Sequence, residues 1–175
     1  MSNLSDKALA ELERGNFTRL EVLLRDNNAT IFDVLDDAGR PKEHLDEAFT
    51  WACMIGRTEV AEQLLDFGAD PAAGMKTGLA GAHYAASGAH TQVIEMLIRR
   101  RVPLETINMY DGTVLGQALW SAIHEHRNSH AAVIEKLIAA GARIEPGTLE
   151  WWDEQDVPSA ETHERVAIAL KRAAE

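Results

Sequence analysis

A small residue recurs at a regular interval through the middle of the chain. Ala52, Ala85 and Ala118 follow one another at equal spacing. Each lies in a segment predicted to be helical, and a small residue at the same position of successive helices allows those helices to pack closely. Self-similarity with a period of roughly 20–50 residues is typical of chains that stack copies of one structural unit. The sequence therefore predicts a stack of repeated helical units.

A second helix is predicted to follow each of these alanines. Three segments carry an apolar residue followed by two more at four and five residues further on, which marks one face of a helix: residues 59–70, 92–103 and 132–143. A glycine ends the first and third of these helices, where a left-handed residue is favoured, and Arg101 replaces it in the second. Val60 and Val93 keep the spacing of the alanines, but the interval from Val93 to Val133 is longer by seven residues. These additional residues lie between Ala118 and Val133.

The repeated unit resembles the ankyrin repeat, a 33-residue helix–turn–helix unit that begins with Thr-Pro-Leu-His-x-Ala. Residues 113–118, Thr-Val-Leu-Gly-Gln-Ala, are a close variant of that start, and residues 80–85 keep its histidine and alanine. Residues 48–52 keep less of it, whereas 68–71 and 141–142 are similar to the family's repeat endings. The resemblance covers about residues 45–145 and is closest to small bacterial ankyrin-repeat proteins. It implies an all-α ankyrin-repeat solenoid.

The N-terminal part, residues 1–44, fits this unit more loosely. It is expected to form a degenerate first repeat followed by an insertion. The interval from Leu23 to Leu64 exceeds the repeat period by about eight residues, which gives the length of the insertion. Glycine and proline within residues 36–42 break regular structure and place the insertion there.

The C-terminal part, residues 146–175, is expected to cap the stack. A short helix is predicted over residues 148–155, and Ser159 is a suitable N-cap for a last helix that runs to about Arg172. Terminal repeats are expected to be atypical because one of their faces meets water. Residues 1–175 are thus predicted to form a single domain of about five helix–turn–helix units, with three clear repeats over 45–145 between atypical end caps.

Charge and composition exclude several classes of function. The chain has 17 basic and 28 acidic residues and a net charge of −11, whereas nucleic-acid binding requires a concentrated basic surface. We therefore expect no nucleic-acid partner, and the acidity favours a partner with a basic surface. No apolar run approaches the roughly 20 residues that span a bilayer, so no membrane partner is expected. A single cysteine and an N-terminus without a secretory signal predict a cytoplasmic location.

The residues whose side chains could take part in catalysis are interpreted as structural. Cys53 occupies a position at which the repeat has a small buried residue, and free cysteines are commonly buried. His83 matches the histidine of the family's start, which the resemblance implies ties a loop to a helix by hydrogen bonds. His90, before the second helix, is interpreted in the same way. The chain is therefore predicted not to be an enzyme and to need no cofactor.

The seven-residue insertion, near residues 124–130, contains His124, Glu125, His126 and His130, which are residue types that bind zinc. His124 and His126 point away from each other on a helix, however, and His126 and His130 share a face only if the helix continues between them. The favoured interpretation is an exposed, dispensable loop that lengthens the preceding helix, and no metal site is predicted.

The resemblance implies that a partner binds to the concave side, which is formed by the first helix of each unit and by the loop tips. Tips are expected near residues 75–77 and 109–111. The residue immediately before each repeat alanine and the residue two positions after it are expected to face the partner. The predicted binding residues are Trp51, Met54, Tyr84, Tyr110, Gln117 and Trp120. For Trp51 and Tyr84, core packing is an equally good interpretation, since aromatic residues are frequent both in cores and at interface hot spots.

The sequence thus predicts a protein–protein interaction module, an adaptor or an inhibitor that binds an unknown partner protein through its concave face. The alternative is a small-ligand or metal-binding protein that uses the aromatic groove or the histidine-rich insertion.

Overall fold

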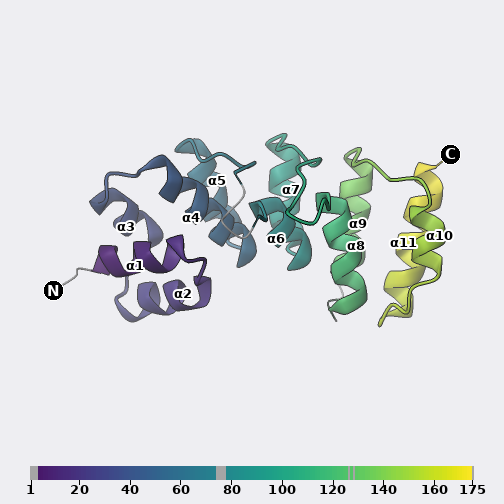
Figure 1. Cartoon of the computed structure of the whole chain (residues 1–175), viewed down its shortest axis with the longest axis horizontal. Helices are drawn as coiled ribbons and strands as arrows, with labels where there is room; N and C mark the ends of the chain where they lie inside the picture. The colour runs from purple at the N-terminus through teal and green to yellow at the C-terminus, as the bar shows by residue number, and fades with distance from the viewer. Residues whose placement is uncertain (1–3, 74–77, 126, 128, 175) are drawn as a thin grey trace.

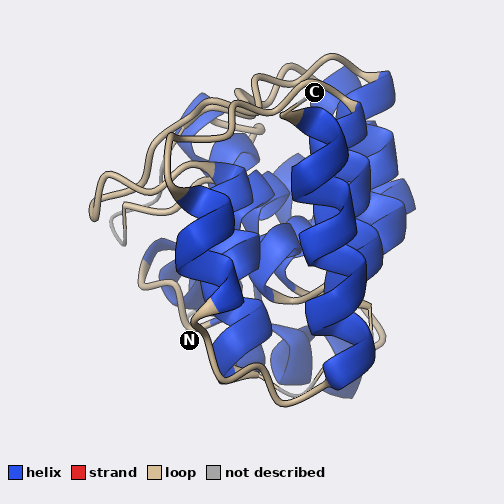
Figure 2. Cartoon of the chain, turned by 90° about the vertical axis from the view of Figure 1, so that its right-hand side faces the viewer, coloured by secondary structure: helices blue, strands red, loops and turns tan. Residues whose placement is uncertain are grey.

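The computed structural model describes residues 4–73, 78–125, 127 and 129–174. In this part of the chain all regular structure is helical and there is no strand, which confirms the all-α class (Figure 2). None of the described helices is both long enough and apolar enough to cross a membrane. The helices are α1 (Leu4–Glu13), α2 (Phe17–Asp26), α3 (Ile31–Asp37), α4 (Lys42–Met54), α5 (Thr58–Asp66), α6 (Gly81–Ser87), α7 (Thr91–Arg99), α8 (Val114–His124), α9 (His130–Ala139), α10 (Thr148–Asp153) and α11 (Ala160–Ala173).

The helices from α4 onward are arranged in two rows along an elongated molecule (Figure 1). The inner row consists of α4, α6 and α8, each of which packs against the next. The outer row consists of α5, α7, α9 and α11, which also pack in succession. The helices α1 and α2 lie along the long axis at the N-terminal end, whereas α7 to α11 run across that axis.

Small side chains hold the inner row together. Ala52, Ala85 and Ala118 are fully buried, as their spacing predicts. Gly81 of α6 packs so closely on α4 that an added Cβ atom would lie 2.9 Å from the ring of Phe49. Cys53 is also buried in this interface, and its burial raises the pKa of the thiol, which confirms that it packs as a small apolar residue.

The second helix of each of four successive helical pairs, α2, α5, α7 and α9, ends in the same turn. The second residue after each helix has a left-handed backbone, and the next backbone N–H donates to the carbonyl five residues earlier at 2.9–3.0 Å. The four left-handed residues are Asn28, Gly68, Arg101 and Gly141. These turns confirm the predicted helix ends. In the turn after α2 the carbonyl that accepts is that of Leu24, and in the turn after α5 it is that of Leu64, so Leu24 rather than Leu23 is the equivalent of Leu64.

These turns also define the length of the N-terminal insertion. The interval from Asn28 to Gly68 equals that from Arg101 to Gly141, which contains the seven-residue insertion of the third copy. The N-terminal insertion therefore has seven residues as well, one fewer than predicted.

The N-terminal insertion contains a helix, α3, that the sequence analysis did not predict. Thr30 begins it with a capping box, in which the Thr30 hydroxyl accepts from the Asp33 N–H and the Asp33 carboxylate accepts from the Thr30 N–H. The predicted break follows this helix. Gly39 and Arg40 have left-handed backbones, and Pro41 precedes the first residue of α4.

The C-terminal cap has the two predicted helices, α10 and α11. The Ser159 hydroxyl accepts a hydrogen bond from the Thr162 N–H at 3.2 Å and so caps α11. Trp152 of α10 is fully buried, and its indole N–H donates to the carbonyl of His163 at 3.1 Å. The His163 ring donates in return to the Trp152 carbonyl at 3.1 Å. This reciprocal pair joins α10 to α11.

Ion pairs connect successive helices of the outer row. In each pair a glutamate at one repeat position meets a cation on the following helix: Glu62 with Arg99 at 2.9 Å, Glu95 with Lys136 at 2.7 Å, and Glu135 with Arg165 at 2.7 Å. The Arg165 guanidinium lowers the pKa of the Glu135 carboxyl. Exposed pairs of this kind contribute about 0–1 kcal/mol each. Val22 occupies the glutamate position in α2, so the series does not extend to the N-terminal helices.

Replacing Arg101 by glycine is expected to stabilise the protein. The Arg101 backbone has φ +55°, which costs an L-residue roughly 1–2 kcal/mol that glycine avoids. The greater freedom of glycine in the unfolded chain offsets part of this. We expect Arg101→Gly to raise the free energy of unfolding by about 0.5–1 kcal/mol, measured by urea titration.

The matched control is Gly68→Ala, at the equivalent turn, where an added Cβ meets no atom within 4 Å and only the backbone conformation opposes it. This variant is expected to lose stability. A loss of stability in Arg101→Gly would contradict the equivalence of these turns.

Candidate partner-binding face

The exposure of the predicted binding residues increases from the first copy to the third. At the position before the repeat alanine, Trp51 is only 5% exposed, whereas Tyr84 and Gln117 are half-buried. The Tyr84 ring meets the Phe17 ring of α2 edge-on, with centroids 6.3 Å apart. At the position two after the alanine, Met54 is half-buried and Trp120 is 51% exposed.

The N-terminal helices cause this difference. Trp51 shares the wall of one cavity with residues of α2 and α3, and Phe17 of α2 reaches Tyr84. Trp51 is therefore a core residue and does not join Trp120 in one exposed aromatic surface, which corrects that part of the sequence prediction. Of the predicted binding residues, the exposed ones are Tyr110, in the loop before α8, and Trp120, on α8.

Asn108 builds the tip of the loop before α8. Its carboxamide oxygen accepts from the N–H groups of Tyr110 and Gly112, both at 2.9 Å, and its backbone N–H donates to the Gly112 carbonyl at 2.9 Å. The Met109 N–H donates to the carbonyl of Gly78 at 3.1 Å, which joins the tip to the preceding loop. Asn108 is itself buried, so the tip has a defined shape despite its position at the surface.

This scaffold holds three large apolar side chains in solvent. Ile107, Met109 and Tyr110 are 60%, 61% and 76% exposed. The tip predicted at residues 109–111 is therefore exposed, whereas the tip predicted at 75–77 lies outside the described residues. Aromatic residues and methionine are enriched at protein interfaces, and here their backbone is already ordered before a partner binds.

Trp120 is fixed in its exposed position by His124, one turn further along α8. The two rings stack with centroids 4.1 Å apart and an interplanar angle of 20°. The His124 Nδ1–H donates to the Trp120 carbonyl at 2.7 Å. The indole is therefore presented on a rigid helix with little freedom to lose on binding.

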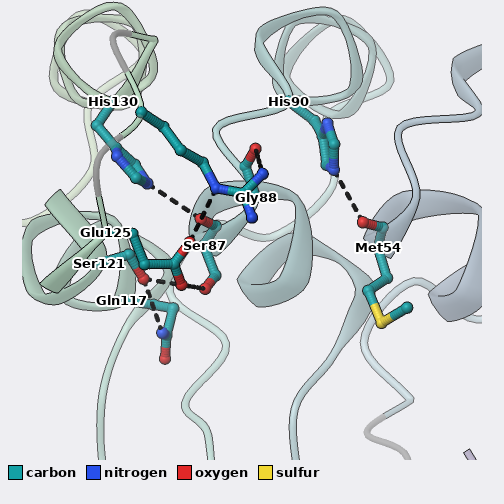
Figure 3. A network of polar contacts seen from close by, with 9 residues as sticks. Met54, Ser87, Gly88, His90, Gln117, Ser121, Glu125 and His130 are labelled. Atoms are coloured by element: carbon teal, nitrogen blue, oxygen red, sulfur yellow. Dashed lines mark hydrogen bonds and ion pairs between the residues drawn. The ribbon is translucent and has the colours of Figure 1, made fainter.

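A chain of hydrogen-bonded polar side chains joins the loop tip to α6, and Figure 3 shows its part from Gln117 to Glu125. Each member hydrogen-bonds to the next, at distances from 3.0 to 3.4 Å: Asn108, Gln117, Ser121, Ser87 and Glu125. Arg127 closes the chain by donating to the Glu125 carboxylate at 2.9 Å and to the Gly88 carbonyl at 3.3 Å. Gln117, a predicted binding residue, is half-buried and is held in place by this chain.

The segment predicted as an insertion near residues 124–130 is partly structural, because His130 occupies the repeat position of His90, and this corrects its interpretation as a wholly exposed loop. It does lengthen the inner helix, because α8 has eleven residues and α6 has seven. His130, however, is fully buried, and its Nε2–H donates to the Ser87 carbonyl at 3.0 Å. His90 makes the equivalent bond to the Met54 carbonyl at 2.8 Å (Figure 3). His126 lies outside the described residues, and the described part of the chain contains no group of three metal-binding side chains.

His83 joins the tip to α6. Its Nε2–H donates to the carbonyl of Gly112 at 3.1 Å, as the predicted structural role requires. Burial lowers the pKa of His83, although hydrogen bonds to the backbone of Gly112 and Thr106 oppose this effect. Burial therefore favours the neutral form of the imidazole.

The face thus combines an ordered apolar tip, a fixed indole and a chain of polar groups, an arrangement suited to a complementary protein surface. No protein-family model matches the chain, and no curated protein matches its sequence.

Sequence reasoning missed several residues of this face. Ile107 lies two residues before Met109. It could have been found as an apolar residue in a loop between the charged residues Glu105 and Asp111. The polar chain through Ser87 and Glu125 joins residues that are distant in the sequence, which no local pattern indicates.

The stability of the protein is expected to fall below neutral pH in a way that depends on His83. Since the pKa of His83 is lower in the folded chain than in the unfolded chain, the unfolded chain binds more protons at this site. The stability that neutral His83 contributes to the folded chain is fully present above the unfolded pKa of about 6.5 and is lost as the pH falls below it. In His83→Gln, which keeps an N–H donor, the free energy of unfolding should fall less between pH 7.5 and 5.5 than it does in the original protein.

Urea titrations of both proteins at pH 7.5, 6.5 and 5.5 measure this difference. Equal losses of stability in the two proteins over this range would show that His83 is not held neutral by the fold.

Proposed function

We propose that this chain is an ankyrin-repeat solenoid that acts as a protein–protein interaction module, an adaptor or an inhibitor, and binds its partner through the face formed by α8 and the loop before it. The single observation that carries the proposal is the exposure of four large apolar side chains on α8 and the ordered loop before it: Ile107, Met109, Tyr110 and Trp120.

The regular spacing of the buried alanines, the equivalent turns after the outer helices and the repeated histidine bonds support the repeat assignment. His90 and His130 each tie the start of an outer helix to the carbonyl at the end of the inner helix of the preceding unit. The same hydrogen bond thus recurs at equivalent positions, which is what stacked copies of one unit require.

The energetics of interfaces support the choice of face. A few aromatic anchors carry most of the affinity in protein complexes, and Tyr110 and Trp120 are the most exposed aromatic residues among those described. The partner need not order the backbone at Tyr110, which Asn108 already holds, or the ring of Trp120, which stacks on His124. Lost side-chain freedom is one of the costs of association, so a preformed anchor increases affinity.

The charge of the chain favours a partner with a basic surface. The net charge is −11, and the acidic residues Glu105 and Asp111 lie beside the apolar tip. Long-range attraction of this kind mainly raises the association rate, and salt screens it.

Removing the two aromatic anchors is expected to abolish binding without unfolding the protein. The immobilised chain would first capture its partner from cytosol of the source cells, and calorimetry would then give the affinity of each variant. Truncating a hot-spot residue costs about 2 kcal/mol or more, so each of Tyr110→Ala and Trp120→Ala should weaken binding about 30-fold or more.

Trp151→Ala is the matched control, since Trp151 is an exposed tryptophan on α10, outside the proposed face. It should leave the affinity unchanged, and the urea midpoints of all three variants should stay near that of the original protein. Retained affinity in the Tyr110→Ala and Trp120→Ala variants would place the binding face elsewhere.

A further inference from the structure

A cavity of about 670 Å³ lies between α2, α3 and α5, away from the proposed partner-binding face. We call it the N-terminal groove. Its volume falls within the range of about 300–1,000 Å³ that is typical of small-molecule sites. Its apolar lining is formed by Val22, Leu24, Ala29, Ile31, Phe32, Trp51 and Val60.

The groove exists because the N-terminal helices interrupt the outer row. The helices α5, α7, α9 and α11 pack in succession, but α2 and α5 make at most marginal contact. The helix α2 lies along the long axis instead of across it (Figure 1). Val22 occupies the position at which Glu62 and its counterparts form ion pairs with the next helix. An apolar residue therefore faces a gap where the other outer helices have a charge pair.

Two kinds of polar group lie in the walls of this apolar groove. The indole N–H of Trp51 is buried and has no acceptor, although buried donors are normally paired. Arg25 and Arg57 also line the groove, together with one carboxylate, that of Glu21. Glu21 is bonded to Arg57 at 3.1 Å, and Arg25 meets the adjacent Asp26 at 3.3 Å. Exposed pairs of this type are weak, so a ligand's anion can replace them.

We propose that the N-terminal groove binds a small apolar carboxylate of the fatty-acid type. The carboxylate lies against the guanidinium groups of Arg25 and Arg57, and the acyl chain covers Val22, Phe32 and the ring of Trp51. The lining contains two arginines and one glutamate, and both arginines form weak, exposed ion pairs that the carboxylate of a ligand can replace.

Decanoate, below its critical micelle concentration, is the probe. Titration into the ¹⁵N-labelled protein is expected to shift the indole N–H signal of Trp51, which Trp51→Phe identifies by its loss. The indole signals of Trp120, Trp151 and Trp152 should not move. Decanol, which has the same chain length but no charge, should bind about tenfold more weakly, since charged hydrogen bonds have about that effect on affinity.

Charge variants separate this site from nonspecific binding. Arg25→Gln and Arg57→Gln change exposed side chains and should each weaken decanoate binding about tenfold, whereas Arg172→Gln, at the opposite end of the molecule, should leave it unchanged. Three results would overturn the proposal: no binding of decanoate, a shift at another tryptophan in place of Trp51, or equal affinity for decanol and decanoate. Because the partner-binding face is remote from this groove, none of them bears on the proposed protein partner.

Discussion

The close approach of α4, α6 and α8 is the constraint on which the rest of the structure depends. Ala52, Ala85 and Ala118 of these helices are fully buried, and Gly81 of α6 lies so close to α4 that an added Cβ atom would meet Phe49 and Cys53. Once the inner row is set, each outer helix follows a short turn, and His90 and His130 fix its start to a carbonyl of the preceding unit. The same surface of each inner helix is thereby directed to the same side of the molecule.

The N-terminal helices change this regular arrangement in two ways. They bury Trp51 and contact Tyr84, so the equivalent surface is open only at the third copy, around Trp120. They also leave α2 in at most marginal contact with α5, which produces the N-terminal groove. Both features have one cause, the change of direction between α2 and the helices that follow it. The proposed protein-binding face and the proposed ligand site therefore lie at different copies of the unit.

The sequence predicts those features that depend on local spacing. The buried alanines, the left-handed helix ends, the cap at Ser159 and the position of the second insertion all follow from periodicity and turn chemistry. The burial of Trp51 does not, because spacing identifies a face of a helix but not the element that covers it. His130 was predictable in principle, since the interval from His90 to His130 equals that from Val93 to Val133. The polar chain through Ser87 and Glu125 joins separate units and has no local signal.

Amide hydrogen exchange of the chain, alone and bound to its captured partner, tests the central claim most directly. Exchange reports which backbone segments become protected when a partner covers them. The partner should slow exchange over residues 105–113 and in the last turn of α8, around Trp120 and His124, and leave α2 and α5 unchanged. Protection confined to the outer row, with no change at the loop tip or α8, would contradict the claim that this face holds the partner.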